Sequence, residues 1–363
     1  MSLLRELFEK AVSMGSSDIH LKANQEPCFR VHGNLQRSGF ENLTPDYMFA
    51  VVKEIMPPYL EKTFEAEHEA DFSHTEEGLG RFRVNVFLSQ GVPVIAMRYV
   101  KSKIPTFEQL RLPPQLSKLA LAERGIILLA GTTGSGKSTT LAAILGEMNR
   151  TQEYRIITVE DPIEYVFEDD KSVVTQREVG LDTLSYQNAL KYLMRQDPDV
   201  ILIGEMRDKM SIRTALLAAE TGHLVLSTLH AGTASLAIPR MLDVFPADEQ
   251  DQIRMGIAGN LHAIVCQRLI PDTKGGAVPA VEIMVNTSTV RKLLEKNKLD
   301  VLSSAIETGK EDGMQTFNQS VYDLIKKGLI TEKDGMSFAT NPESLRMNLQ
   351  GIFLDEGKRI LGA

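Results

Sequence analysis

The sequence predicts an α/β fold, built on a largely parallel sheet that helices cover on both faces. Four apolar segments of strand length alternate with segments of helical periodicity, which is the pattern that buried parallel strands produce. The chain has 363 residues, enough for two domains, and its 43% hydrophobic content allows a substantial core. The strand-like segments are 125–130, 155–160, 199–205 and 224–230.

Residues 1–100 predict a smaller mixed domain. Helical periodicity runs over residues 3–14, and the polar run that starts at Gly15 ends it before Ile19-His20-Leu21, which alternates as a strand does. Three further segments, 28–33, 81–87 and 92–100, also have the alternation or the β-rich composition of strands, whereas 48–59 has helical character.

A proline-rich segment separates this domain from the α/β core. Residues 101–118 contain Pro105, Pro113 and Pro114 and show little periodicity, so we expect a linker. From Asn286 the chain becomes polar and helix-rich. The expected organisation is therefore an α+β domain over 1–100, a linker over 101–118, an α/β core over 119–285 and a helical C-terminal subdomain over 286–363.

The charge balance and the cysteine count exclude several classes of protein. A formal net charge of −8 provides no general field for nucleic acid, so no stable nucleic-acid partner is expected. Cys28 and Cys266 are too few for a disulfide framework or a cysteine-based zinc site, and both are expected to be packing residues in a reducing cytosol.

Apolar runs in the chain are short. None approaches the roughly 18 residues that a membrane-spanning helix needs, so the chain is not expected to cross a bilayer. Charged residues interrupt the apolar ones in Met1–Met14, which predicts a surface helix and not a signal peptide.

A phosphate-binding loop follows the first strand-like segment of the core. The run from Gly131 to Ser138 matches the pattern G-x-x-x-x-G-K-[ST], in which glycines let backbone N–H groups face phosphate oxygens. In such a loop Lys137 reaches the β- and γ-phosphates of ATP, and the Ser138 hydroxyl coordinates Mg²⁺. An ordinary glycine-rich turn is disfavoured, because a strand precedes the loop and helical periodicity follows it. The residues expected to bind nucleotide are Gly131, Thr132, Thr133, Gly134, Ser135, Gly136, Lys137, Ser138 and Thr139.

Two more strand-like segments end in carboxylates. Glu205 follows an apolar strand, and we expect it, rather than Asp199 at the start of that strand, to support Mg²⁺ through water, because the chemistry lies beyond the carboxyl ends of parallel strands. The segment that ends in Glu160, Asp161 and Glu164 supplies a candidate general base, for which Glu164 is preferred over Glu160 and Glu205. Solvated acids at strand ends are the alternative for both segments.

Two histidines flank the last strand-like segment of the core. The separation of His223 and His230 does not match a metal-binding pair on a helix, so a zinc site is not expected. If this strand lies beside the one that precedes the phosphate loop, His230 is placed to sense the γ-phosphate of ATP. The alternative is a structural histidine.

The order of these segments resembles that of the secretion ATPases of type II and type IV systems. The shared segments are the phosphate loop, Ile157–Glu164, Asp199–Glu205 and Thr221–Ala231, and Ser17–Leu21 looks like the opening strand of the family's regulatory domain. The resemblance implies a RecA-like P-loop ATPase core with a small PAS-like α+β N-terminal domain and a helical C-terminal subdomain.

Within that family the chain resembles the pilus retraction ATPases. The run Gly313–Gln319 and the short N-terminal region are similar to that branch, and two cysteines cannot build the four-cysteine zinc loop of the extension and type II secretion relatives. The run is shared by the principal motor and its accessory paralogue, and Val290–Leu299 matches the principal motor's helix only loosely, so both branches stay open.

The resemblance also implies an assembly and partners. We expect a cytoplasmic homohexamer, peripheral at the inner membrane, which binds ATP and Mg²⁺ at subunit boundaries and drives pilus retraction and twitching motility. The expected partners are an inner-membrane platform protein, other pilus machinery and a paralogous retraction ATPase. Arginines must stabilise the charge that develops on the γ-phosphate, although a solvated face is the alternative for any one of them. The candidate arginine fingers are Arg81, Arg83 and Arg98 from the N-terminal domain and Arg195, Arg207 and Arg240 from the core.

Two other functions share parts of this pattern. A RecA-like motor that translocates nucleic acid has the same ATP chemistry, but it should carry a basic channel with aromatic residues, whereas this chain is acidic and contains no tryptophan. A structural ring or adaptor that binds ATP without hydrolysing it is disfavoured by the presence of Lys137, Glu164 and Glu205.

Overall fold

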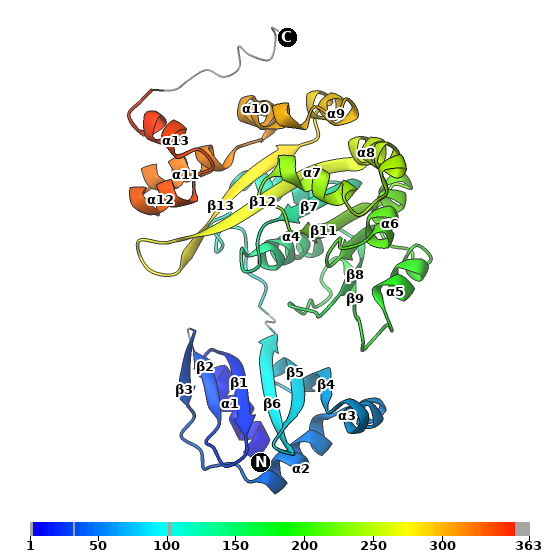
Figure 1. Ribbon diagram of the computed structural model, residues 1–363, viewed down its shortest axis with the longest axis vertical. Helices are drawn as coiled ribbons and strands as arrows, with labels where there is room; N and C mark the ends of the chain where they lie inside the picture. The colour runs from blue at the N-terminus through cyan, green and yellow to red at the C-terminus, as the bar shows by residue number, and fades with distance from the viewer. Residues whose placement is uncertain (1–2, 32, 101–102, 353–363) are drawn as a thin grey trace. The chain divides into compact units, whose positions relative to one another are not determined.

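The protein folds as two compact units in the computed structural model, which describes residues 3–31, 33–100 and 103–352 (Figure 1). The first unit contains the described residues up to Lys103 together with two later segments, Pro162–Val166 and Glu178–Leu184. The second unit contains Ile104–Asp161, Phe167–Arg177 and the described residues from Ser185 onwards. Each unit has its own sheet and its own core.

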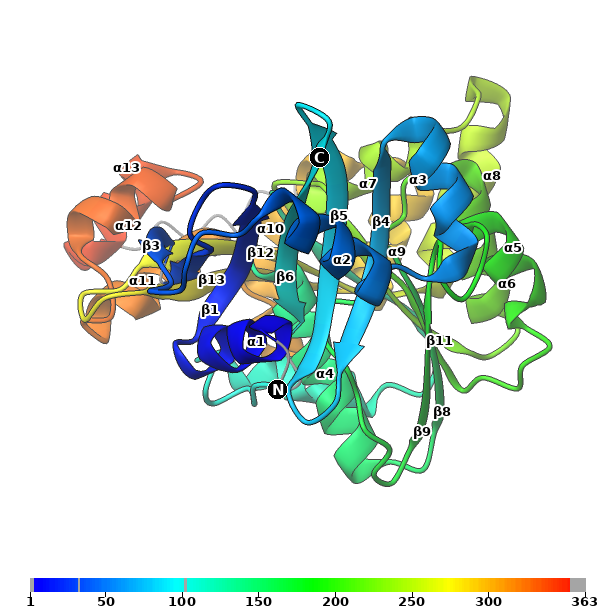
Figure 2. The ribbon, with the colours of Figure 1, turned by 90° about the horizontal axis from the view of Figure 1, so that it is seen from below.

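A six-stranded sheet forms the first unit (Figure 2). Its strand order is β3-β2-β1-β6-β5-β4, and every neighbouring pair is antiparallel. The strands alternate between a buried and a more exposed face, as in β5, where Phe82, Val84 and Val86 are buried. The strands are β1 (Ser16–Lys22), β2 (Cys28–Val31), β3 (Asn34–Arg37), β4 (Glu69–Glu76), β5 (Gly80–Ser89) and β6 (Val92–Val100).

Helices cover the buried face of this sheet. Helix α1 (Leu3–Ser13) turns Leu4, Leu7, Phe8 and Ala11 toward the core, the spacing of one helical face. Helix α2 (Pro45–Ile55) begins after Thr44, whose Oγ1 accepts a hydrogen bond from the Tyr47 N–H. The short elements η1 (Pro58–Leu60) and α3 (Glu61–Glu67) lead back to β4.

A seven-stranded sheet forms the second unit, in the order β13-β12-β7-β11-β10-β8-β9. The neighbouring strands β12, β7, β11, β10 and β8 run parallel to one another, and β13 is antiparallel to β12. This arrangement confirms the largely parallel sheet predicted from the sequence. The strands are β7 (Gly125–Ala130), β8 (Arg155–Glu160), β9 (Val173–Glu178), β10 (Val200–Ile203), β11 (Leu224–Leu229), β12 (Leu261–Pro271) and β13 (Ala277–Val285).

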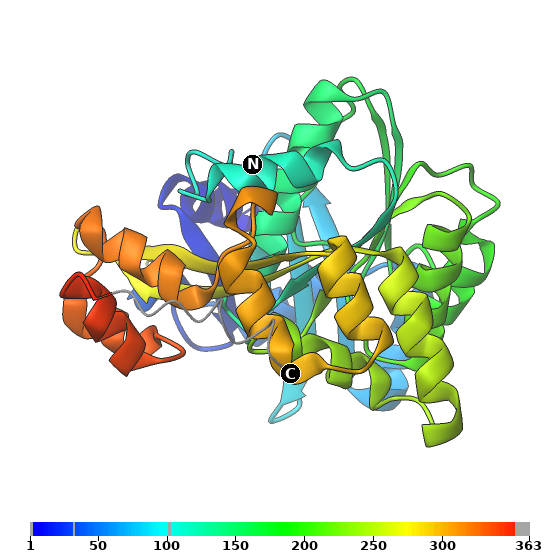
Figure 3. The ribbon, with the colours of Figure 1, turned by 90° about the horizontal axis from the view of Figure 1, so that it is seen from above.

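Helices lie on both sides of this sheet (Figure 3). Helix α4 (Lys137–Thr151) and the 3₁₀ segment η2 (Pro114–Leu121) pack on one face, where alternate residues of β7, β11 and β12 point. The following helices complete the unit: α5 (Tyr186–Leu193), α6 (Lys209–Glu220), α7 (Ala234–Leu242), α8 (Ala247–Asn260), α9 (Ser288–Glu295), η3 (Leu299–Val301), α10 (Leu302–Thr308), η4 (Lys310–Asp312), α11 (Phe317–Lys326), α12 (Glu332–Phe338) and α13 (Pro342–Leu349). No helix among the described residues is both long enough and apolar enough to span a bilayer.

The segment expected to be a linker contributes to the core of the second unit. Phe107, Leu112 and Leu116 are buried in the cluster beneath α4, and Ile104 contacts the helix at Gly146. Pro113 and Pro114 lie at the start of η2, where their fixed φ is compatible with the backbone. Because turns and 3₁₀ structure bury residues at irregular spacing, this core segment has no helical or strand period.

Candidate functional site

The phosphate loop connects the end of β7 to the start of α4. Helix α4 begins at Lys137, directly after Gly136, so the free N–H groups of its first turn face the loop. The Lys137 ammonium folds over the loop and donates hydrogen bonds of 3.0 Å to the carbonyl oxygens of both Gly131 and Thr132. Ser135 is buried, and its Oγ has no hydrogen-bond partner among the described residues. A loop of this shape presents donors to an anion.

Two glycines of this loop are required by its geometry. Gly131 has a φ of 153°, and a Cβ there would lie 2.5 Å from Ser135 Oγ and 2.6 Å from the Gln267 carbonyl oxygen. Gly136 has a φ of 88°, and a Cβ there would lie 2.6 Å from Gln267 Nε2. Both positions combine a left-handed backbone with close contacts, so any side chain would distort the loop.

Gln267 on β12 connects the sheet to the phosphate loop and to helix α4. This residue was not identified from the sequence. Its amide Nε2 donates to the Ser135 carbonyl at 2.7 Å, and its Oε1 accepts from Thr140 Oγ1 at 2.8 Å. The side chain is 3% exposed, so water does not replace these bonds. A polar residue inside the apolar strand Leu261–Pro271 is the signal that sequence reasoning could have used.

The strand ends bring several predicted residues together. Leu229 of β11 pairs with Ala130 of β7, so His230 lies beside the start of the phosphate loop. Strand β10 lies next to β11 on the other side, and Glu205 follows it. The structure therefore confirms that the strand leading to His230 neighbours the strand that leads to the loop.

Glu205 is the centre of a small charged cluster at the carboxyl ends of β10 and β11. Its carboxylate accepts a hydrogen bond of 2.6 Å from Arg207 Nε, and His230 Nε2 lies 3.4 Å from its other oxygen. The hydrogen bond to Glu205 raises the pKa of Arg207 above its usual value, so this guanidinium stays charged. Arg207 thus contacts the acid of its own chain. The His223 ring, by contrast, lies at the opposite end of β11, with its Nδ1 3.0 Å from the Ala218 carbonyl oxygen.

The acids that follow β8 have different surroundings. Glu160 ends the strand, and its Oε1 accepts hydrogen bonds from Thr158 Oγ1 at 2.6 Å and from Gln176 Nε2 at 3.2 Å. Glu164 is exposed and lies on Pro162–Val166, the segment that belongs to the first unit. The assignment of Glu164 as a general base stays a prediction.

Tyr186 is a further residue of this edge that sequence reasoning missed. It is the first residue of α5, and a Cβ on Gly204 would lie 2.5 Å from its hydroxyl oxygen. Burial, followed by the nearby Asp161, raises the pKa of Tyr186 well above its usual value, so the phenol is neutral and can donate a hydrogen bond. No sequence motif indicates a role for Tyr186, because a tyrosine at the start of an amphipathic helix is common.

A pocket of about 340 Å³ adjoins the phosphate loop. Leu110, Leu112 and Leu269 provide apolar walls, while Gly136 and Thr139 connect it to the start of α4. Arg111 forms an ion pair with Asp272 at this pocket. A cavity of this size, with apolar walls and a few polar groups beside an anion-binding loop, suits the base of a nucleotide.

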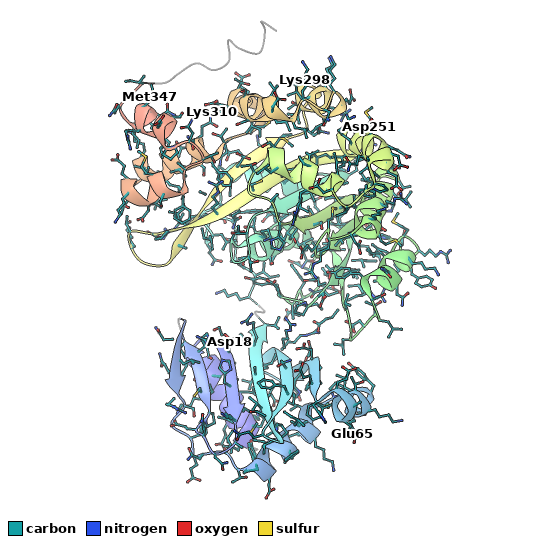
Figure 4. All side chains as sticks on the ribbon, in the orientation of Figure 1. Asp18, Glu65, Asp251, Lys298, Lys310 and Met347 are labelled. Carbon is teal, nitrogen blue, oxygen red and sulfur yellow. The ribbon has the colours of Figure 1, made fainter. Side chains whose placement is uncertain are left out.

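The candidate arginines of the first unit lie on β5 and β6. Arg81 forms an ion pair of 2.8 Å with the buried Glu178, a residue of the same unit. Arg98 lies directly opposite Arg83 in the sheet, and it forms an ion pair of 2.8 Å with Asp18, which is labelled in Figure 4.

The other two candidate arginines of the core are exposed. Arg195 follows α5, and Arg240 is in the last turn of α7. The assignment of arginine fingers stays a prediction.

Comparison with known proteins places this site in a family context. Residues 1–322 match the model of the type II/IV secretion system protein family. The chain is 42% identical to the type IV pilus retraction ATPase PilT of Pseudomonas aeruginosa, over 94% of this chain and 99% of that protein. It is 40% identical to the type IV pilus ATPase PilU of the same organism, over 96% of this chain and 90% of that protein.

A solved structure has the same fold. The crystal structure of the pilus retraction motor PilT with bound ADP superposes with a TM-score of 0.88 at 42% identity, and the match covers 95% of this chain and 99% of that one. The match to these relatives therefore extends over nearly the whole of this chain.

Proposed function

The chain belongs to the type II/IV secretion system protein family, and from that membership we propose that it is a motor which uses ATP hydrolysis to retract type IV pili. The protein is an ATPase with a RecA-like core. The observation that carries the proposal is the complete phosphate loop, with His230 after the neighbouring strand β11 and Glu205 after the next strand β10, in a chain similar to PilT over nearly its full length.

The donor set of the loop fits a nucleotide with Mg²⁺. The glycine cradle has no room for a Cβ at Gly131 or Gly136, and the buried Ser135 Oγ is without a partner among the described residues. Ser138 follows Lys137 in the first turn of α4, and Glu205 supplies a carboxylate from β10. When bound, Mg²⁺ would neutralise charge on the β- and γ-phosphates. Ser138 would hold it directly, and Glu205 would hold it through water.

The side chains of this site have separate proposed roles. The Lys137 ammonium leaves the carbonyl oxygens of Gly131 and Thr132 and binds the β- and γ-phosphates, since a phosphate oxygen is a stronger acceptor for it. Glu164 orients the attacking water and accepts its proton, because an exposed carboxylate can bind a water molecule. His230 senses the γ-phosphate. The pocket beside Leu110 and Leu269 takes the adenine base.

The assembly is proposed from the family. We place the protein in the cytoplasm as a homohexamer at the inner membrane, with ATP at the subunit boundaries. Its partners are the inner-membrane platform protein of the pilus, other pilus machinery and a paralogous retraction ATPase. One or more of Arg81, Arg83 and Arg98 would reach a neighbouring subunit's nucleotide, for which Arg81 must first leave Glu178 and Arg98 must leave Asp18.

The experiment that tests retraction is a deletion of the gene followed by inspection of pili on the cell surface. Loss of a retraction motor leaves extension unopposed, so we expect cells with more surface pili and no twitching motility. Cells without pili would overturn the proposal, because that result identifies an extension motor. Complementation with Lys137→Ala should fail to restore twitching, which ties the phenotype to the nucleotide site.

A further inference from the structure

One buried carboxylate joins the starts of two helices that are far apart in the sequence. Glu282 on β13 is 5% exposed, and its Oε1 accepts a hydrogen bond of 2.8 Å from the N–H of Ala234. The backbone of Phe317 also favours the charged form of this carboxylate, with a weaker effect on its pKa than burial and the Ala234 N–H. Ala234 and Phe317 are the first residues of α7 and α11, where N–H groups lack a partner within the helix. A carboxylate is favoured at such a position.

Arg268 on β12 makes a second connection between the segment that leads into α7 and the C-terminal helices. Its Nη1 donates to the Phe338 carbonyl at 2.6 Å, at the end of α12, and its Nη2 lies 3.4 Å from the Gly232 carbonyl. The guanidinium also lies over the Phe317 ring, 3.9 Å from its centroid. Strands β12 and β13 carry both residues, so the sheet itself supports this double connection.

Of these two connected segments, only the one that leads into α7 follows a residue of the candidate site. Gly232 and Ala234 follow His230 directly, on the path from β11 into α7. Phe317 and Phe338 belong to the C-terminal helices, which contact the β12–β13 hairpin. The run Gly313–Gln319, noted in the sequence but without a role in the site, supplies the start of α11 through the capping box of Thr316 and Gln319.

Stability alone is a weak reason for this arrangement. Removing a carboxylate from water is costly, and burial indeed raises the pKa of Glu282 above its usual value. Apolar residues of similar volume commonly give equal or better stability at such a position. A polar pair that is hydrogen-bonded to two separate segments instead fixes their relative position, because both segments lose a bond if either one shifts.

We infer that Glu282 and Arg268 are positioning residues that make the segment after His230 and the helices α11 and α12 move together, so that the state of the nucleotide site reaches the C-terminal helices. This inference rests on the proposed function, in which His230 responds to the γ-phosphate of ATP. Neither residue lines the pocket beside the phosphate loop. Their role is to transmit a displacement of Gly232 and Ala234 to Phe317 and Phe338.

Hydrogen exchange of the full-length protein measures this transmission. Exchange is compared by mass spectrometry without nucleotide, with ADP and with a non-hydrolysable ATP analogue. In the wild type, the ATP analogue should change exchange both in 230–242 and in 317–338, whereas ADP should change neither to the same extent. In Glu282→Gln, the change in 230–242 should persist and the change in 317–338 should be lost, because the neutral amide replaces one acceptor oxygen by an NH₂ group, which cannot accept a hydrogen bond from an N–H at a helix start.

Ser320→Ala is the matched control. Ser320 Oγ accepts a hydrogen bond of 3.1 Å from the Val281 N–H, so it fastens α11 to β13 without touching the segment after His230. This variant should loosen α11 but keep the response of 317–338 to the ATP analogue. Arg268→Lys is the second test variant, because lysine retains the charge but cannot bond Gly232 and Phe338 in one plane. It keeps the inference testable if Glu282→Gln folds poorly.

The outcomes separate the inference from the proposed function. If the wild type binds the ATP analogue but exchange in 317–338 does not change, or if Glu282→Gln and Arg268→Lys respond as the wild type does, the coupling is wrong and the ATPase assignment stands. An equal loss in Ser320→Ala would also overturn it, since any loosening of α11 would then suffice. If the wild type binds no nucleotide, the proposed function itself fails.

Discussion

Replacement of Gln267 by leucine should weaken ATP binding without a change at any group that touches phosphate. The buried amide makes hydrogen bonds of 2.7 Å to the Ser135 carbonyl and 2.8 Å to Thr140 Oγ1. Leucine has a similar volume but no polar atom, so both partners lose their bond. Thr140 can bond the carbonyl of the preceding helical turn instead, whereas the Ser135 carbonyl loses the bond that connects the loop to β12.

The expected magnitude follows from that one carbonyl. A buried polar group left without a partner costs about 1–3 kcal/mol, and every ~1.4 kcal/mol corresponds to a tenfold change in a dissociation constant. If the loop relieves this cost by leaving its phosphate-binding shape, Kd for ATP should rise by about tenfold to a hundredfold. Titration calorimetry with ATP and with ADP measures the effect, and thermal unfolding of the same sample reports any loss of global stability.

Thr140→Val is the matched control for this prediction. It removes the hydroxyl from Gln267 Oε1 but leaves the bond from Gln267 Nε2 to the Ser135 carbonyl, so Kd should change much less than in Gln267→Leu. Wild-type affinity in Gln267→Leu would refute the reasoning, because the loop would then keep its shape without this support. An equal loss in Thr140→Val would refute it as well.

The remaining predictions concern the chemistry and the assembly. Lys137→Ala should abolish Mg²⁺-dependent ATP turnover in a phosphate-release assay. If the wild-type protein shows no turnover under any nucleotide, metal or partner condition, the assignment as an ATPase is wrong. Glu164→Gln should bind ATP but hydrolyse it about 10²–10⁴-fold more slowly, as expected on loss of a general base, and a near wild-type rate would transfer that role to Glu160 or Glu205. Glu205→Gln should shift the Mg²⁺ dependence of the rate more than Glu164→Gln does. Light scattering with an ATP analogue should give the mass of a ring of six 40.3 kDa chains, whereas a strict monomer with the full rate would argue against a subunit-boundary site.

The sequence predicted the elements that show a periodic pattern of apolar residues or a contiguous motif. The apolar strands of the core and the loop from Gly131 to Ser138 lie where the pattern placed them, because alternation and glycine spacing are local properties. The order of strands brought His230 next to the loop, as expected of a parallel sheet. The division into four parts, with limits at 100, 118 and 285, stays a prediction.

The residues that were missed are defined by contacts that the sequence does not display. Phe107, Leu112 and Leu116 pack beneath α4 although their spacing follows no period. Tyr186 reaches the backbone at Gly204 from a helix of ordinary composition. Such contacts arise from the arrangement of separate segments in space, and one sequence without aligned relatives contains no measure of that arrangement.

Strand β12 connects the two parts of the site because neighbouring residues of a strand point to opposite faces of a sheet. Gln267 points to the face of α4 and holds the phosphate loop, whereas Arg268 points to the other face and holds the segment after His230. One strand therefore supports the loop that binds phosphate and the segment proposed to sense it. Since the two side chains have different partners, their loss should separate two properties that a general loss of structure would change together. Gln267→Leu should raise Kd and leave the response of the C-terminal helices intact once ATP is bound, whereas Arg268→Lys should leave Kd nearly unchanged and remove that response.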